Sequence, residues 1–322
     1  DATYASVRTA AVGAVSAIEL TCDVALSAAL ALAPLHAHRT DDPGVLPERA
    51  RLAELIDFAS RDVDAQLTAW ASSSPRTAVP VGVGAGGAPV RLDVVGDGPH
   101  GLLGGMTRSG KTEFLKTWIA ALALHNHPDD LAIVIVDFKG GVDHQPLTRL
   151  PHVVALATNQ DIDRFERTLT LLAAELERRQ TVFVDQGGVA TLEGYRTART
   201  SRADLPAVPR LLVVVDEFAE LLATPEGRAQ LGRLESIARV GAGLGVHLLL
   251  VTQLFDHALP PTIEAQAGLR VCFKVQQPEH SNTVLRSPAA AALAGTARGR
   301  GFVRRRDGEL GEFQAARVGN AS

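Results

Sequence analysis

Eight consecutive residues match the phosphate-binding pattern G-x-x-x-x-G-K-[ST]. They are Gly105, Met106, Thr107, Arg108, Ser109, Gly110, Lys111 and Thr112. The glycines let such a loop fold tightly, so that successive backbone N–H groups point at phosphate oxygens. We expect Lys111 to reach the β- and γ-phosphates of a nucleotide and the Thr112 hydroxyl to bind Mg²⁺. Glu113 follows in the first turn of the next helix and is a further candidate for nucleotide contact.

Polar residues follow two apolar runs further along the chain. Asp216 and Glu217 come directly after Leu211 to Val215, and Gln253 comes directly after Leu249 to Thr252. Asp216 is predicted to hold the hydration shell of Mg²⁺, and Glu217 to polarise a water for attack on the γ-phosphorus. Gln253 is a candidate sensor of the γ-phosphate, although a surface amide at a strand end explains it equally well.

The elements that would position these residues have the pattern of an α/β protein. Leu131 to Val136, Leu211 to Val215 and Val246 to Val251 are continuous apolar runs, typical of parallel strands buried on both faces. A helix is predicted from Thr112 to His125. Another is predicted where Ile162, Phe165, Leu169, Leu172 and Leu176 recur at helical spacing. Strands separated by helices predict a mostly parallel, doubly wound sheet.

The first part of the chain has a different pattern. Residues 1 to about 72 are alanine-rich and predict helices, interrupted near residues 40–44, with a second helical piece after Pro47. A β-hairpin is predicted over residues 79–94. The linker-like run from Ser72 to Pro75 divides the chain into a helical appendage, residues 1–75, and an α/β domain with the phosphate loop, residues 76–322.

Composition narrows the classes of protein that fit. The 322 residues are 46% hydrophobic and carry a formal charge of −4, which argues against a nucleic-acid footprint over the whole chain. The longest apolar run near the start, Val24 to Leu35, is shorter than the about 20 residues that span a bilayer. Because the chain begins at Asp1 and its single methionine is Met106, we expect a piece of a longer protein whose membrane anchor lies elsewhere.

With these motifs placed, the chain resembles the FtsK/SpoIIIE branch of RecA-like P-loop ATPases. More narrowly, it resembles the first ATPase domain of EccC-type motors of type VII (ESX) secretion. The resemblance runs from about residue 78 to 317. Besides the phosphate loop, the segments that carry it are Pro99 to Leu102, Val136 to Gly141, Leu150 to Val153, Val213 to Leu222 and Gly245 to Gln253.

The resemblance implies a hexameric, ring-forming ATP motor on the cytoplasmic side of a membrane complex that exports proteins. ATP and Mg²⁺ are the implied ligands: Lys111 and Thr112 bind them, Asp216 assists the metal and Glu217 activates water. The chain departs from the family at Arg108, which replaces a usual glycine, and at Leu254-Phe255, where the family tends to have Arg-Pro.

Four basic residues have open roles. In ring ATPases of this type a neighbour's arginine completes the site, so the isolated chain should hydrolyse ATP slowly. Arg270 is the first candidate for that arginine, and Arg298 and Arg300 are the second; a surface ion pair is the alternative for Arg270. Lys139 follows a strand beside the phosphate loop and would contact nucleotide, a neighbour or substrate, or lie exposed on a turn.

Three functions remain in competition. An ATP-driven protein-export motor is favoured over a DNA translocase of the FtsK/SpoIIIE or conjugative type, because the chain is acidic and has few lysines. We therefore expect DNA not to be a partner, and secreted proteins and other components of a secretion complex to be partners. A catalytically silent nucleotide-binding module is the third class. His100, His152 and His247 are expected to be buried structural histidines.

Overall fold

The computed structural model describes residues 45–56, 63–72, 74–140, 142–158, 162–202, 204–223, 225–253 and 260–319. The chain divides into two compact units, Asp1–Val45 and Leu46–Ser322, and the elements given below belong to the second. The helices expected before residue 45 therefore lie outside the described residues. No helix within the described residues is long and apolar enough to cross a membrane.

One half of an eleven-stranded sheet is parallel, in the order β9-β4-β8-β7-β5-β6. Four of these strands, β4, β5, β7 and β8, are buried along their whole length, which explains the continuous apolar sequences of the last three. The prediction of a mostly parallel α/β sheet is confirmed. The strands are β4 (His100–Gly104), β5 (Leu131–Asp137), β6 (Val153–Thr158), β7 (Arg210–Asp216), β8 (Val246–Thr252) and β9 (Ala267–Phe273).

Four further strands are antiparallel to their neighbours and continue the sheet beyond β9. The predicted hairpin forms from β2 (Ala78–Val83) and β3 (Pro89–Asp93), joined through the short turn η1 (Ala85–Gly87). Between them and β9 lie β11 (Leu310–Arg317) and β10 (Arg300–Arg304).

The expectation of a helical piece after Pro47 is wrong at Ala50–Arg51, the strand β1, which pairs with β11 in parallel. One helical turn, α2 (Leu52–Leu55), follows β1, and Val63–Ser72 is helical as expected.

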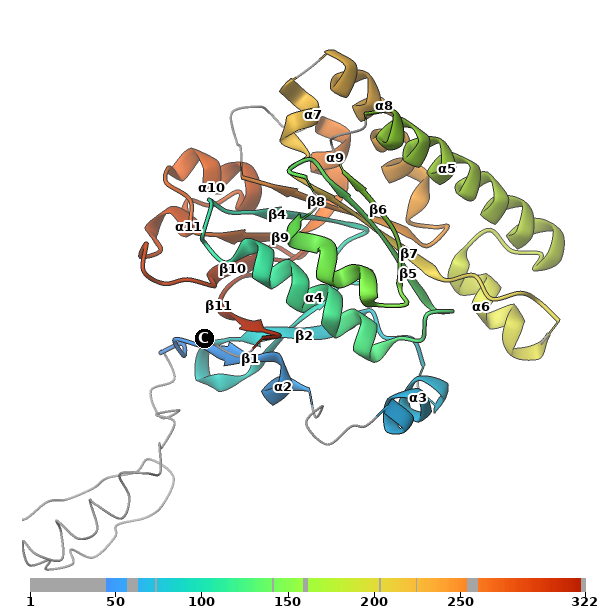
Figure 1. Ribbon diagram of the computed structural model, residues 1–322, viewed down its shortest axis with the longest axis horizontal. Helices are drawn as coiled ribbons and strands as arrows, with labels where there is room; N and C mark the ends of the chain where they lie inside the picture. The colour runs from blue at the N-terminus through green and yellow to red at the C-terminus, as the bar shows by residue number, and fades with distance from the viewer. Residues whose placement is uncertain are drawn as a thin grey trace, which may run out of the picture. The chain divides into compact units, whose positions relative to one another are not determined.

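Helices cover both faces of the sheet (Figure 1). Alternate residues along β7 point to opposite faces: Val213 joins one core and Val214 the other. On the Val214 side packs α4 (Lys111–His125), and on the Val213 side pack α5 (Ile162–Thr181), α6 (Leu192–Ser201) and α8 (Pro225–Gly241). Both predicted helices, α4 and α5, are thus confirmed. The remaining elements are α3 (Val63–Ser72), η2 (Val142–Arg149), η3 (Val182–Gln186), α7 (Ala219–Ala223), α9 (Pro261–Gln266), α10 (Pro278–Leu285) and α11 (Ala289–Ala292).

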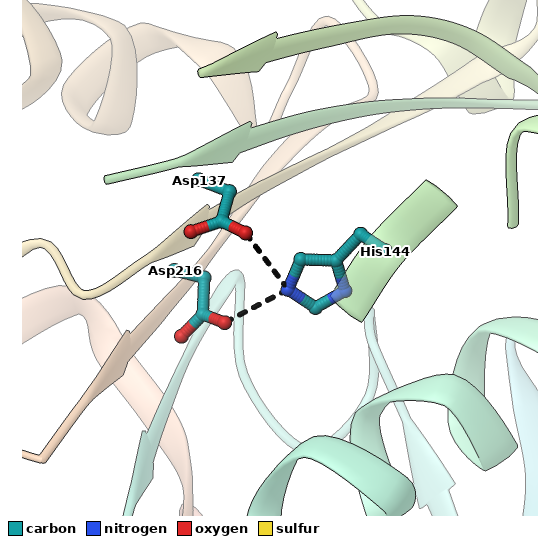
Figure 2. Close-up of side chains that lie close together, drawn as sticks. All are labelled: Asp137, His144 and Asp216. Carbon is teal, nitrogen blue, oxygen red and sulfur yellow. Dashed lines mark hydrogen bonds and ion pairs between the residues drawn. The ribbon is translucent and has the colours of Figure 1, made fainter. Parts of the chain in front are cut away.

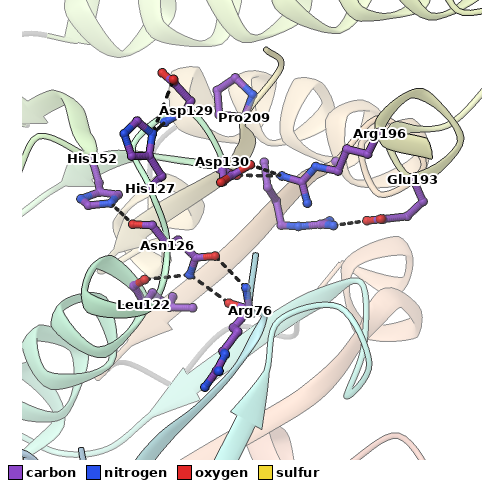
Figure 3. A network of polar contacts seen from close by, with 12 residues as sticks. Arg76, Leu122, Asn126, His127, Asp129, Asp130, His152, Glu193, Arg196 and Pro209 are labelled. Carbon is purple, nitrogen blue, oxygen red and sulfur yellow. Dashed lines mark hydrogen bonds and ion pairs between the residues drawn. The ribbon is translucent and has the colours of Figure 1, made fainter. Parts of the chain in front are cut away.

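The segment before the β2–β3 hairpin is hydrogen-bonded to the carboxyl end of α4. The Trp70 indole of α3 donates to the Ala123 carbonyl at 3.1 Å. Asn126, which follows α4, accepts from the backbone N–H of Arg76 at 2.8 Å and donates to its carbonyl at 2.9 Å (Figure 3). Residues 63–76 therefore contact the helix whose first residue is Lys111.

Candidate functional site

The phosphate-binding pattern forms a loop between β4 and α4. Gly105 and Gly110 have φ angles of 153° and 104°, which side chains rarely adopt. A Cβ at Gly105 would lie 2.9 Å from the Cβ of Phe273, and one at Gly110 would lie 2.8 Å from the backbone nitrogen of Gly299. Only glycine fits at both ends of the loop, so the spacing of the motif follows from this geometry.

Backbone hydrogen bonds tie the phosphate loop to residues near Lys274 and Gly299. The Met106 N–H donates to the Lys274 carbonyl at 2.9 Å, and the Gly299 N–H donates to the Ser109 carbonyl at 2.9 Å. Arg108 lies at the exposed side of the loop with a φ of 65°, the left-handed region. This backbone conformation explains why the resembled family tends to have glycine there, and it strains the arginine of this chain.

The ammonium group of Lys111 is buried without a hydrogen-bond partner among the described residues. Its nearest carboxylate oxygens are Oδ1 of Asp216 at 3.7 Å and Oε2 of Glu217 at 3.9 Å. Burial lowers the pKa of Lys111, although both carboxylates act in the opposite direction. A buried, unpartnered cation beside a tight glycine loop fits a phosphate group.

Sheet topology brings the predicted carboxylates to this loop. Strand β8 lies between β4 and β7, and its last residue, Thr252, pairs with Gly104 directly before the loop. Asp216 ends β7 beside it. Parallel strands that end at one edge form the crevice in which ligands of such sheets bind. Thr112 is the second residue of the neighbouring helix α4.

Glu217 lies at the centre of a polar network. It is fully buried and has a φ of 61°. Its Oε1 accepts from the backbone N–H of Gln253 at 2.9 Å and from the Thr252 hydroxyl at 3.2 Å. Its Oε2 forms an ion pair with Lys139 at 2.6 Å. The Thr107 hydroxyl donates to the side-chain oxygen of Gln253 at 2.7 Å, which links the phosphate loop to Glu217.

Asp216 has a second partner that the sequence did not indicate. Its Oδ2 accepts from Nε2 of His144 at 2.8 Å, and the same nitrogen lies 3.8 Å from Oδ2 of Asp137 (Figure 2). Burial by itself raises the pKa of Asp216, but the His144 hydrogen bond and the Lys111 charge outweigh it, so the pKa is lowered. The position of Asp137 could have indicated a polar cluster here, because Asp137 is the last residue of β5 and pairs with Asp216 on β7.

The structure argues against Arg270 as an arginine that reaches a neighbour. Its side chain is 3% exposed and its guanidinium donates to three backbone carbonyls of its own chain. Burial lowers its pKa to about 10. Arg270 is therefore a structural group that ties β9 to the segments around it. The bonded carbonyls belong to Ala267, Val284 and Glu264.

Other predicted residues also have partners within the chain. Arg300 donates to the carbonyl of Pro47 at 3.0 Å. Arg298 is exposed, but it precedes Gly299, which contacts the chain's own phosphate loop. Glu113 accepts from Lys116 at 3.0 Å. The guanidinium groups of Arg270 and Arg300 thus bind groups of their own chain, and Arg298 is the exposed one of the three candidate arginines.

The three histidines predicted to be structural are buried and bonded to backbone carbonyls. His100 contacts the carbonyl of Ala238, His152 that of Asn126 and His247 that of Pro99, at 2.7 to 2.8 Å. This prediction is confirmed.

The chain is similar in sequence to a known protein family and to individual proteins. A family model described as the FtsK/SpoIIIE family matches residues 63–257. The "ESX-4 secretion system protein EccC4" of Mycobacterium tuberculosis is 35% identical over 88% of this chain, which covers 24% of that protein. The "ESX secretion system protein YukB" of Bacillus subtilis is 35% identical over 87% of this chain and 19% of that protein. The chain thus spans a quarter or less of the length of these relatives.

Solved structures show the same fold. The cytoplasmic domain of the type VII secretion ATPase EccC of Thermomonospora curvata matches with a TM-score of 0.78 and 33% identity, over 85% of this chain and 33% of that one. A conjugation coupling protein solved with an ATP analogue matches with a TM-score of 0.66 over 86% of this chain and 72% of that one. At 22% identity, the second match shows a shared fold alone.

Proposed function

Because this chain belongs to the FtsK/SpoIIIE family, we propose that it is the ATP-binding and ATP-hydrolysing motor domain of a type VII protein secretion complex. The observation that carries the proposal is the buried Lys111 ammonium between the phosphate loop and the carboxylates of Asp216 and Glu217. The names of the ESX relatives support secretion as the process that the motor drives.

The residues divide the work as follows. Lys111 and the N–H groups of the loop hold the phosphates, and Thr112 and Asp216 would hold Mg²⁺. When bound, that ion neutralises charge that develops on the transferred phosphoryl group. Glu217 accepts a proton from the attacking water, which requires that its Oε2 leave Lys139. Gln253, held by Thr107 and bonded through its N–H to Glu217, reports the state of the γ-phosphate to the carboxylate.

The assembly is part of the proposal. We expect a hexameric ring on the cytoplasmic side of the membrane, with secreted proteins as substrates and other secretion components as partners. An arginine from a neighbouring subunit would complete each site, so the isolated chain hydrolyses ATP slowly. The division into an appendage over residues 1–75 and an ATPase domain over residues 76–322 stays a prediction; the described residues of 46–72 belong to the same compact unit as the sheet.

Turnover in the presence of DNA separates the competing functions. We expect the 322-residue chain to hydrolyse ATP, Glu217→Gln to lose that turnover, and duplex DNA to leave the rate unchanged. Stimulation by DNA at low salt that disappears at moderate salt would instead identify a DNA translocase. Equal rates for the chain and Glu217→Gln would identify a catalytically silent nucleotide-binding module.

A further inference from the structure

Three buried side chains converge where β5 and β7 end. Asp137 and Asp216 are paired residues of the two neighbouring parallel strands. His144 lies on η2, directly after the turn that follows β5, and turns its Nε2 toward both carboxylates (Figure 2). The three residues are 2%, 6% and 0% exposed, in the order Asp137, Asp216 and His144. From this arrangement we propose that they form a binding site for a divalent first-row transition-metal ion, separate from the Mg²⁺ that accompanies nucleotide.

The distances suit a small ion. One ligand atom from each side chain lies within 4.8 Å of the others, and Nε2 of His144 is 2.8 Å and 3.8 Å from the two Oδ2 atoms. Metal–ligand bonds of about 2.0–2.2 Å in a tetrahedral site place the ligand atoms about 3.3 Å apart. The two distances from Nε2, 2.8 Å and 3.8 Å, each lie about half an ångström from this value, and the two carboxylate oxygens lie within 4.8 Å of each other.

Neighbouring groups hold the ligands in this orientation. The Lys139 N–H donates to Oδ1 of Asp137 at 2.6 Å, which leaves Oδ2 facing the imidazole. Oδ1 of Asp216 faces Lys111, so its Oδ2 also faces His144. A hydrogen on Nε2 is donated to one carboxylate at a time, whereas a metal ion would bind all three groups together. Such fixed outer contacts are characteristic of metal sites.

The donor set selects the class of metal. Imidazole nitrogen suits Zn²⁺ and other first-row transition ions, and carboxylates also suit Mn²⁺. Mg²⁺ requires nearly octahedral oxygen ligation and keeps several waters, which one nitrogen and two carboxylates in a buried site do not provide. His144 is therefore the residue that distinguishes this site from one for the nucleotide's Mg²⁺.

Sharing Asp216 would connect the ion to ATP turnover, and this consequence alone rests on the proposed function. Oδ2 of Asp216 would bind the transition ion, while Oδ1 remains on the side of Lys111 and the phosphate loop. An ion at His144 would fix the carboxylate and alter the affinity for Mg²⁺-ATP. Binding of the ion itself needs no nucleotide.

The test is a titration of the nucleotide-free 322-residue chain with Zn²⁺. Binding is measured by calorimetry, and the unfolding temperature is measured with and without Zn²⁺. We expect one Zn²⁺ per chain and a raised unfolding temperature. His144→Gln and Asp137→Asn should each weaken binding by at least about tenfold, since even outer-shell changes cost about 10–100-fold. His280→Gln, a histidine on α10 away from the cluster, is the matched control and should bind as the unchanged chain does.

Mn²⁺ provides a second readout that needs no variant. Pulsed electron paramagnetic resonance of the Mn²⁺-loaded chain should show coupling to an imidazole nitrogen, and a tenfold excess of Mg²⁺ should not remove it. The absence of that coupling, or equal Zn²⁺ affinity of the chain and a folded His144→Gln, would overturn the proposal and leave His144 as a hydrogen-bond donor to Asp216. Because both measurements omit ATP, they stand apart from the test of hydrolysis.

Discussion

The ammonium group of Lys139 lies 2.6 Å from Oε2 of Glu217. Lys139 follows β5 and is 44% exposed in its side chain, whereas Glu217 follows β7 and is completely buried. Oε1 of Glu217 is already bonded to Gln253 and Thr252, so the ion pair occupies the oxygen that would otherwise face a water. The proposed role of Glu217 as a base therefore requires that Lys139 leave Oε2.

A double-mutant cycle measures this pair directly. We expect Lys139→Met and Glu217→Gln to show a coupling of about 0.5–3 kcal/mol in the free energy of unfolding without nucleotide, as residues in contact do. The exposure of Lys139 to solvent places the value toward the lower end. The coupling free energy should become smaller when a non-hydrolysable ATP analogue saturates the site, because Lys139 then leaves Glu217. Additive effects of the two changes without nucleotide would show that the pair contributes nothing.

Removing the Gln253 side chain tests its proposed role as a sensor. Gln253→Ala keeps the backbone N–H that binds Glu217, so the carboxylate should stay in place. We expect kcat to fall at least about tenfold, equivalent to about 1.4 kcal/mol of transition-state stabilisation. The Kd for ATP should change little. A matched Thr107→Val, which removes only the hydroxyl bonded to Gln253, should show a smaller loss in the same direction. Unchanged kcat in both variants would make Gln253 a surface amide.

Arg270→Ala should act on stability rather than through a neighbouring subunit. The change leaves three backbone carbonyls without their donor, two of them buried and one partly buried, and each unsatisfied buried group costs about 1–3 kcal/mol. We expect chemical denaturation to show a loss of about 3 kcal/mol or more. A second experiment tests the role in a neighbouring subunit: the protein that carries both Glu217→Gln and Arg270→Ala is mixed with the unchanged chain, and ATP turnover is measured. If Arg270→Ala keeps full stability yet fails to support ATP turnover by its neighbours, Arg270 is the trans arginine after all.

His247 should make stability depend on pH. Burial, followed by the charge of Arg210, lowers the pKa of His247 from its ordinary value near 6.5 to about 3. Between these values the unfolded chain binds a proton that the folded chain does not, so stability falls as pH falls from 6.5 toward 3. The slope is about 1.4 kcal/mol per pH unit. In urea unfolding between pH 5 and 7, His247→Gln should flatten this dependence, and parallel curves for the two proteins would contradict it.

Much of the fold was predictable because burial leaves a strong pattern in the sequence. Strands β5, β7 and β8 are covered on both faces, so each is a continuous apolar run, and the amphipathic α5 keeps its spacing. The short β1 was not predictable, since two residues carry no periodicity and their strand conformation depends on pairing with β11. The antiparallel order β9-β10-β11-β2 likewise depends on contacts between segments distant in sequence.

The site was predictable where function constrains consecutive residues. Lys111, Asp216 and Glu217 stand in local patterns, and the sheet brings them together as strand ends must. The ion pair of Lys139 and the position of His144 were not accessible, because each depends on the path of the turn after β5. The surroundings of Arg270 were not accessible either, since a sequence does not reveal that its guanidinium donates to three carbonyls of its own chain.

The affinity for Mg²⁺-ATP tests the central claim most directly. Lys111→Ala is compared with Lys116→Ala, which removes a lysine paired with Glu113 on the same helix. We predict that Lys111→Ala abolishes measurable binding, that Lys116→Ala binds as the unchanged chain does, and that Glu217→Gln binds ATP but does not hydrolyse it. Equal ATP affinity of the unchanged chain and a folded Lys111→Ala would contradict the assignment of this loop as the nucleotide site.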